Sequence, residues 1–137
     1  MERFLGLDVG EKTIGLAVSD PLGITAQAVT TIKRTSNKED YERVKEYIDY
    51  YKIESLVVGL PYNMNGSLGP SADRAKKFAE KLRNKYQVQI IYQDERMTTM
   101  SAERVLIEAG VRRENRKTHI DKIAAVFILQ AFLDSRF

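Results

Sequence analysis

The feature that most constrains the fold is a change of pattern between the first third of the chain and the rest. In the first third, residues 3–9, 13–18 and 24–32 are apolar or β-branched runs, which are typical of strands. Short turn signals around Gly10 and Pro21 separate these runs. Because turns this short join neighbouring antiparallel strands, the sequence predicts an N-terminal meander of three strands.

The rest of the chain alternates helical and strand patterns. The run 55–60 is continuously apolar, as expected for a strand buried on both faces. A loop over 61–70 follows it, at the strand end where ligands usually bind in α/β sheets. The order βββαβαβαα therefore predicts an α/β fold with parallel crossovers and helices covering the sheet. The other expected elements are a strand over 88–92 and four helices. The first has Asn37 as its N-cap and apolar residues at 41, 44, 48 and 51; the second and third have apolar residues over 75–86 and 102–109; the last runs roughly over 118–133.

Composition narrows the classes of function. The 137 residues fit one domain, expected over 1–137, since domains typically run about 100–150 residues. The absence of cysteine excludes a thiolate nucleophile, a disulfide framework and a Cys-ligated metal. No apolar run approaches the roughly 20 residues that span a bilayer, and no signal peptide is visible, so we expect a soluble, cytoplasmic protein without a membrane partner. The net charge of +3 permits a nucleic-acid partner without requiring one.

Asp8 is the first residue that the fold alone does not explain. It lies inside the first strand, between Leu7 and Val9. A lone buried carboxylate is costly unless a partner, a metal or hydrogen bonds compensate for the lost water. The alternative interpretation is a half-solvated position near the strand end, or a pair with a lysine.

Asp94 and Glu95 form a second acidic feature, directly after the fifth strand. Parallel strands bring their carboxyl ends to one edge of a sheet, so Glu95 comes near Asp8 if the first and fifth strands run parallel. The alternative is an ordinary loop or helix cap, although Thr98 and Thr99 are also available for capping.

Asp121 is the third acidic feature, on the otherwise apolar final helix. Thr118 to Asp121 matches a capping box with Asp in place of Glu or Gln, so a helix cap is the competing interpretation. A basic run around it favours a phosphodiester site, against the alternative of a solvated basic loop. The run consists of Arg112, Arg113, Arg116, Lys117 and Lys122.

Together these three carboxylates suit metal-dependent phosphodiester hydrolysis. Mg²⁺ prefers oxygen ligands, and two such ions about 3.5–4 Å apart can activate water and stabilise a leaving oxygen. A His-rich transition-metal site is not expected, because His119 is the one histidine. We expect His119 at a helix start, with a role in proton transfer as the alternative.

A nucleotide-binding loop is excluded despite a partial match. The segment from Gly6 to Thr13 resembles G-x-x-x-x-G-K-[ST], but the second glycine is replaced by Glu11. A carboxylate there repels phosphate, and the following segment is expected to be a strand rather than a helix.

Four blocks of sequence together resemble the YqgF (RuvX-like) family, in the same order over nearly the whole chain. Agreement of four separate blocks is far more specific than any single motif. The blocks are Gly6-Leu-Asp-Val-Gly with Ile14-Gly-Leu-Ala-Val-Ser-Asp20, Val58-Gly-Leu-Pro61 with Met64-Asn-Gly-Ser67 and Gly69, Asp94-Glu-Arg-Met-Thr-Thr99, and Ile120-Asp-Lys-Ile-Ala-Ala125 with Ile128-Leu-Gln130.

The resemblance implies an RNase H-like fold with a five-stranded mixed sheet, and a nuclease of the two-metal-ion type that uses Mg²⁺ or Mn²⁺. The family's acidic triad falls on Asp8, Glu95 and Asp121, which would be both catalytic residues and metal ligands. Thr13 stands where the family usually has Arg or Lys, so a phosphate contact is either missing there or supplied by Lys12. The residues expected to contact nucleic acid are Lys12, Arg96, Thr98, Thr99, Arg113, Arg116 and Lys117.

The resemblance also implies the partners. Family members are associated with 5′-end processing of pre-16S ribosomal RNA and with resolution of Holliday junctions. We therefore expect structured RNA or branched DNA as substrate, ribosomal precursor particles as a further partner, and a monomer or homodimer. The alternatives are a non-catalytic protein that binds nucleic acid or ribosomes, and an ATP-dependent phosphotransferase. The second rests on the likeness of Asp8-Val-Gly10 to a phosphate motif of the actin, sugar-kinase and Hsp70 superfamily, whose members need two such domains.

Overall fold

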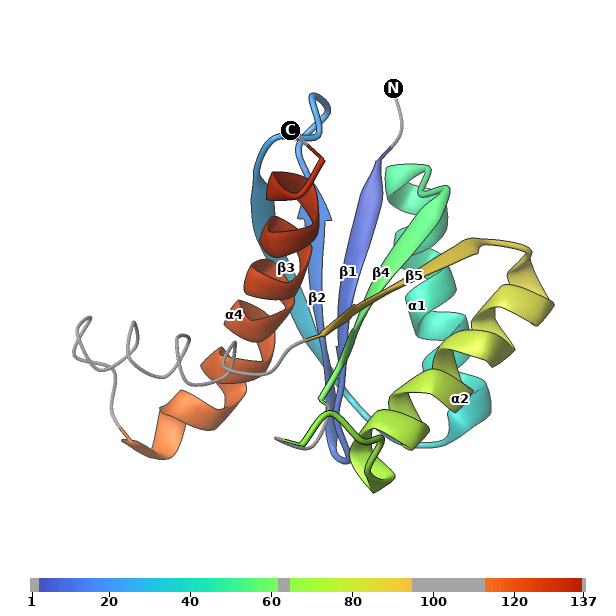
Figure 1. The fold of residues 1–137 in the computed structure, drawn as a ribbon. Helices are drawn as coiled ribbons and strands as arrows, with labels where there is room; N and C mark the ends of the chain where they lie inside the picture. Colours follow the sequence, from blue (N-terminus) through green and yellow to red (C-terminus); the bar gives the residue numbers. More distant parts are fainter. Residues whose placement is uncertain (1–2, 62–64, 95–112, 137) are drawn as a thin grey trace.

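A computed structural model describes residues 3–61, 65–94 and 113–136, with side chains described throughout these ranges except at 113–122. The helix expected over 102–109 lies outside the described residues. Most strand boundaries lie within two residues of those expected from the sequence. In chain order the elements are β1 (Phe4–Val9), β2 (Thr13–Ser19), β3 (Ala26–Lys33), α1 (Asn37–Tyr51), β4 (Ser55–Leu60), α2 (Pro70–Tyr86), β5 (Gln89–Asp94) and α4 (Arg113–Asp134) (Figure 1).

The five strands form one mixed sheet in the order β3-β2-β1-β4-β5. β1 pairs antiparallel with β2, and β2 with β3, as the short turns predicted. β4 pairs parallel with β1 on one side and with β5 on the other. The mixed five-stranded sheet is therefore confirmed, and the carboxyl ends of β1, β4 and β5 share one edge.

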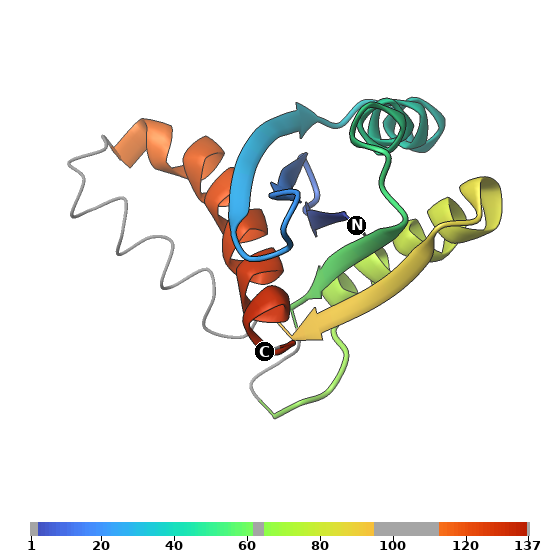
Figure 2. The ribbon, with the colours of Figure 1, turned by 90° about the horizontal axis from the view of Figure 1, so that it is seen from above.

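Helices cover both faces of the sheet and create two cores. α1 and α2 lie on one face and α4 lies on the other (Figure 2). Side chains alternate between the two faces along each strand. Leu5 and Leu7 of β1 thus join the core under α1 and α2, whereas Phe4 joins the core under α4. β4 is buried at every residue, which confirms the prediction from its continuous apolar run.

α4 approaches β1 closely at Gly6. A Cβ atom at this position would lie 2.9 Å from the Cβ atom of Leu129 and 3.0 Å from the carbonyl oxygen of Ala125. One end of the contact is closed by Phe4 and Phe132, whose ring centroids are 5.0 Å apart. Only glycine lets the helix pack at this distance, so Gly6 sets the separation of α4 from the sheet.

Two predictions about helix starts are wrong. Ser36, not Asn37, is the N-cap of α1, because its hydroxyl oxygen accepts a hydrogen bond from the Glu39 backbone N–H at 3.2 Å. Asn37 is already helical, and its side-chain oxygen accepts a hydrogen bond from Arg34 at 2.8 Å instead.

α4 begins at Arg113, five residues before the expected start at Thr118. The stretch from Thr118 to Asp121 is therefore inside the helix, where it cannot be a capping box, and His119 is not a helix-start residue. In the described part of the chain, no helix combines the length and the apolar character needed to cross a membrane.

Replacing Gly6 with Ala is expected to destabilise the fold. Overpacking a close contact typically costs about 1–3 kcal/mol. The reduced entropy of the unfolded chain offsets only about 0.4–1 kcal/mol of that cost. Urea unfolding followed by circular dichroism should therefore show a net loss in the free energy of unfolding. A variant as stable as the parent would mean that α4 shifts freely over β1.

Candidate active site at the ends of the parallel strands

Asp8 lies next to the last residue of β1, on the sheet face that α4 covers. Side chains two residues apart share a face, and Gly6 on the same strand faces α4. Asp8 is half-buried, and it has at least one polar partner in the fold. The carboxylate is thus partly shielded from solvent, at the sheet end where the carboxyl ends of the parallel strands lie.

Glycines flank Asp8 on both neighbouring strands. Gly15 of β2 is its direct antiparallel partner. On the other side, Leu7 pairs with Val58, so the next residue of β4, Gly59, is level with Asp8. Neither neighbour carries a side chain, so the Asp8 carboxylate is bordered by backbone on both adjacent strands.

α4 brings the turn that contains Asp121 toward the same end of the sheet. From Gly6 to Asp8 the strand advances about 6.6 Å. In the same direction, the helix from Ala125 back to Asp121 advances about 6 Å, or roughly one turn. The side chain of Asp121 is not among those described.

Glu95 follows Asp94, the last residue of β5, and lies outside the described residues. The sequence placed Asp94 just after the fifth strand, whereas it is the strand's final residue. β1 and β5 do run parallel, which was the condition for Glu95 to come near Asp8. In the described part of the chain, no three His, Cys, Asp or Glu residues form a group able to hold a metal. The proposed triad includes residues beyond that part, so it stays a prediction.

The predicted contacts to nucleic acid are only partly described. Lys12 is exposed in the turn between β1 and β2. Arg113, Arg116 and Lys117 lie in the first turns of α4, and their side chains are not described. The remaining predicted contacts, Arg96, Thr98 and Thr99, lie outside the described residues.

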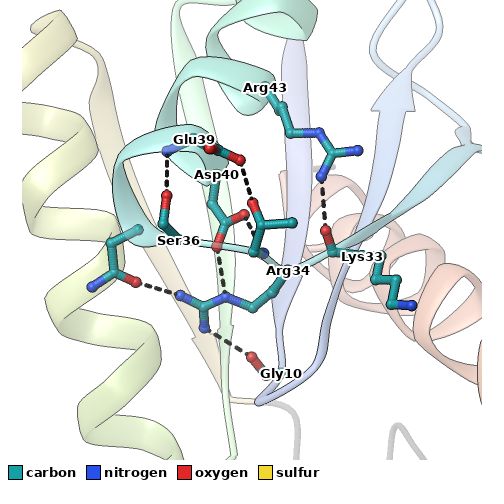
Figure 3. A network of polar contacts seen from close by, with 9 residues as sticks. Gly10, Lys33, Arg34, Ser36, Glu39, Asp40 and Arg43 are labelled. Atoms are coloured by element: carbon teal, nitrogen blue, oxygen red, sulfur yellow. Dashed lines mark hydrogen bonds and ion pairs between the residues drawn. The ribbon is translucent and has the colours of Figure 1, made fainter.

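The turn after β1 is held in place by Arg34, which the sequence reading missed. Arg34 donates one hydrogen bond to the carbonyl oxygen of Gly10 at 3.0 Å (Figure 3). Its backbone N–H donates to the carbonyl oxygen of Lys12 at 2.8 Å. Two hydrogen bonds from Arg34, the residue that follows β3, therefore fix the turn within a few residues of Asp8.

Asp40 at the start of α1 orients Arg34. The two side chains form an ion pair with 3.0 Å between Nε and Oδ2, and they are 13% and 1% exposed. The guanidinium carbon of Arg34 also lies 5.1 Å from the centre of the Phe78 ring. A sequence signal for this pair existed, because Asp40, Val44 and Ile48 are spaced four apart and thus occupy the buried face of α1.

Replacing Arg34 with Met is expected to lower the free energy of unfolding by about 3 kcal/mol. The change leaves the Asp40 carboxylate buried without its cation, and breaking a buried pair typically costs about 3–5 kcal/mol. Thermal and urea unfolding measure the loss. Arg43→Ala is the matched control, since exposed Arg43 donates a single bond to the carbonyl oxygen of Lys33.

The control should lose no more than about 1 kcal/mol. Equal losses in the two variants would show that the Arg34 pair has no special part in the fold.

Comparison with known families gives a match over almost the whole chain. The family model described as "RuvX: Holliday junction resolvase" matches residues 2–135. A protein of Thermoanaerobacter pseudethanolicus named "Putative pre-16S rRNA nuclease" is 54% identical over 135 residues, covering 98% of this chain and 97% of its own. A protein of the same name from Listeria monocytogenes is 53% identical, covering 97% and 98%.

Solved structures confirm the RNase H-like fold. RuvC of T. thermophilus, in complex with a Holliday junction substrate, aligns with a TM-score of 0.64 and 16% identity, covering 99% of this chain and 96% of its own. The fowlpox virus resolvase, in complex with Holliday junction DNA, aligns with a TM-score of 0.59 and 16% identity, covering 98% and 99%. At this level of identity the likeness concerns the fold.

Proposed function

Since this chain belongs to the RuvX family, we propose that it is a nuclease that hydrolyses phosphodiester bonds in ribosomal RNA precursors. The observation that carries the proposal is the half-buried Asp8 carboxylate, bordered by glycines at the shared end of the parallel strands. A carboxylate in that position is costly for a merely structural protein and useful to one that holds a cation.

The proposed metal ligands are Asp8, Glu95 and Asp121. Their carboxylate oxygens are the donors that Mg²⁺ and Mn²⁺ prefer. Gly15 and Gly59 place no side chain beside Asp8 on the neighbouring strands, which is compatible with a cation bound there. When bound, two such ions would supply an activated water and stabilise the leaving oxygen.

The chain's own residues would position the cations and the substrate. Asp8 would fix the position of the cations from the rigid centre of the sheet, while Asp121 would approach from α4. Lys12 would hold a backbone phosphate from the adjacent turn, which Arg34 keeps in place. Such contacts position the substrate without reading its sequence. The further proposed phosphate contacts are Arg96, Thr98, Thr99, Arg113, Arg116 and Lys117.

Two relatives named for pre-16S rRNA favour an RNA precursor as the substrate, which would place the protein in the cytoplasm with ribosomal precursor particles as partners. A monomer with one site suffices for trimming an RNA end. The family description favours a second candidate, the resolution of Holliday junctions. Symmetric cutting of a four-way junction needs two active sites, and hence a homodimer.

The decisive experiment compares the parent with Asp8→Asn on a precursor rRNA fragment and on a four-way DNA junction, each with Mg²⁺ or Mn²⁺. Loss of a ligand that stabilises the transition state by several kcal/mol corresponds to a fall in cleavage rate of at least about 100-fold. Gel electrophoresis of end-labelled substrates measures the rate.

Asp20→Asn is the matched control. Asp20 accepts hydrogen bonds from the backbone N–H groups of Ile24 and Thr25 in the loop between β2 and β3, a role that an amide oxygen can retain. It should cleave at the parental rate. Equal rates for Asp8→Asn and the parent would disprove the triad, and binding without cleavage under either metal would favour the non-catalytic alternative.

A further inference from the structure

A row of adjoining depressions, called the groove below, lies along α1 and α2, on the face of the sheet opposite α4 (Figure 2). Three adjoining depressions of about 400, 490 and 570 Å³ form it, and Asn37 lines all three. One end lies at the turn between β1 and β2, where it is lined by Lys12 and Lys33. The other end lies beside Asn84 and Lys85 on α2. The groove therefore begins at a turn that follows the strand carrying Asp8.

Basic residues line α2 along this groove. Arg74, Lys77, Lys81 and Lys85 are spaced three or four residues apart, so they form one row on the helix surface. The row repeats about every 5.4 Å along the helix axis. Lys77 pairs with Asp73 at 3.0 Å, while the other three form no ion pair among the described residues. The charges of Arg74, Lys81 and Lys85 are thus available to an anionic partner.

The opposite wall adds to the positive charge. Lys33 and Lys38 line the groove from β3 and α1. Two acidic residues lie on this side of the groove. Asp40 is buried and its charge is paired with Arg34, and Glu11 lies at the end nearest the turn. A phosphate chain lying between the helices would meet cations on both sides.

The same groove contains an aromatic ring. Tyr41 lines two of the three depressions, and its ring centroid lies 4.8 Å from that of Phe78 beneath it. A basic groove with an aromatic ring on its wall is the combination that binds single-stranded nucleic acid, because the cations follow the backbone and the ring offers a surface to a base.

We propose that this groove binds a single-stranded segment of nucleic acid that extends from the substrate held at Asp8. The proposal rests on the proposed function, because Lys12 lines the groove and also lies in the turn beside the candidate active site. The groove would then retain the flanking strand of a precursor while its cleavage site lies at the ends of the parallel strands.

The test is the binding of a fluorescent single-stranded RNA of about 12 nucleotides, a length within the usual range for such grooves. Anisotropy is measured in a chelator, so that no cleavage occurs. The groove variant is Lys81→Gln with Lys85→Gln, and the matched control is Lys76→Gln with Arg83→Gln. Both pairs lie on α2 and remove two positive charges, but Lys76 and Arg83 do not line the described groove.

The groove variant should bind about 10-fold more weakly than the parent at about 0.1 M salt, and its log–log salt slope should fall by about 1.4, since each contact with a single strand contributes about 0.7. The control should bind like the parent, and both should retain the parental melting temperature. Equal losses in the two variants, or tighter binding of a duplex of the same length, would overturn the proposal. If the parent protein cleaves neither substrate but the groove variant still binds RNA more weakly than the parent, the groove proposal is supported. Only the proposed nuclease function is then contradicted.

Discussion

The close packing of α4 on β1 at Gly6 is the constraint on which the rest of the structure depends. It closes the second core of the sheet, in which Phe4, Ala17 and Val57 pack with residues of α4. It also fixes where the helix turn that contains Asp121 lies relative to Asp8. The same contact therefore affects both the stability of the fold and the proposed chemistry. It depends on glycine, because a side chain at position 6 would push α4 away from β1.

The two faces of the sheet have different proposed roles. On the α4 face, Asp8 lies between Gly15 and Gly59 at the end of the parallel strands. On the α1 and α2 face, the larger core carries stability, and its outer surface carries the basic groove. The turn after β1 lies between the two faces, and Arg34, directly after β3, holds it in place. Lys12 in this turn is consequently placed to serve both faces.

The sequence was sufficient to predict the five strands and the helices α1, α2 and α4, because apolar runs and apolar residues at helical spacing mark what each element buries. It failed at helix ends. Asn37 and Thr118 both have capping side chains, yet Asn37 bonds to Arg34 and Thr118 lies inside α4. Asp8 stood out because a carboxylate breaks an apolar run. Arg34 did not stand out, because an arginine in a predicted loop is expected to be solvated. Only the folded structure shows that it pairs with the buried Asp40 carboxylate.

The order of the elements along the chain has a consequence for biosynthesis. α4 follows all five strands in the sequence, yet it covers β1, β2 and β3, which leave a ribosome before it. Contacts between such distant segments form late in folding, and the face they cover stays exposed until then. A partly made chain can thus assemble the core beneath α1 and α2 while its other face remains apolar and open. The second core and the proposed nuclease face would be completed together, only after α4 has left the ribosome.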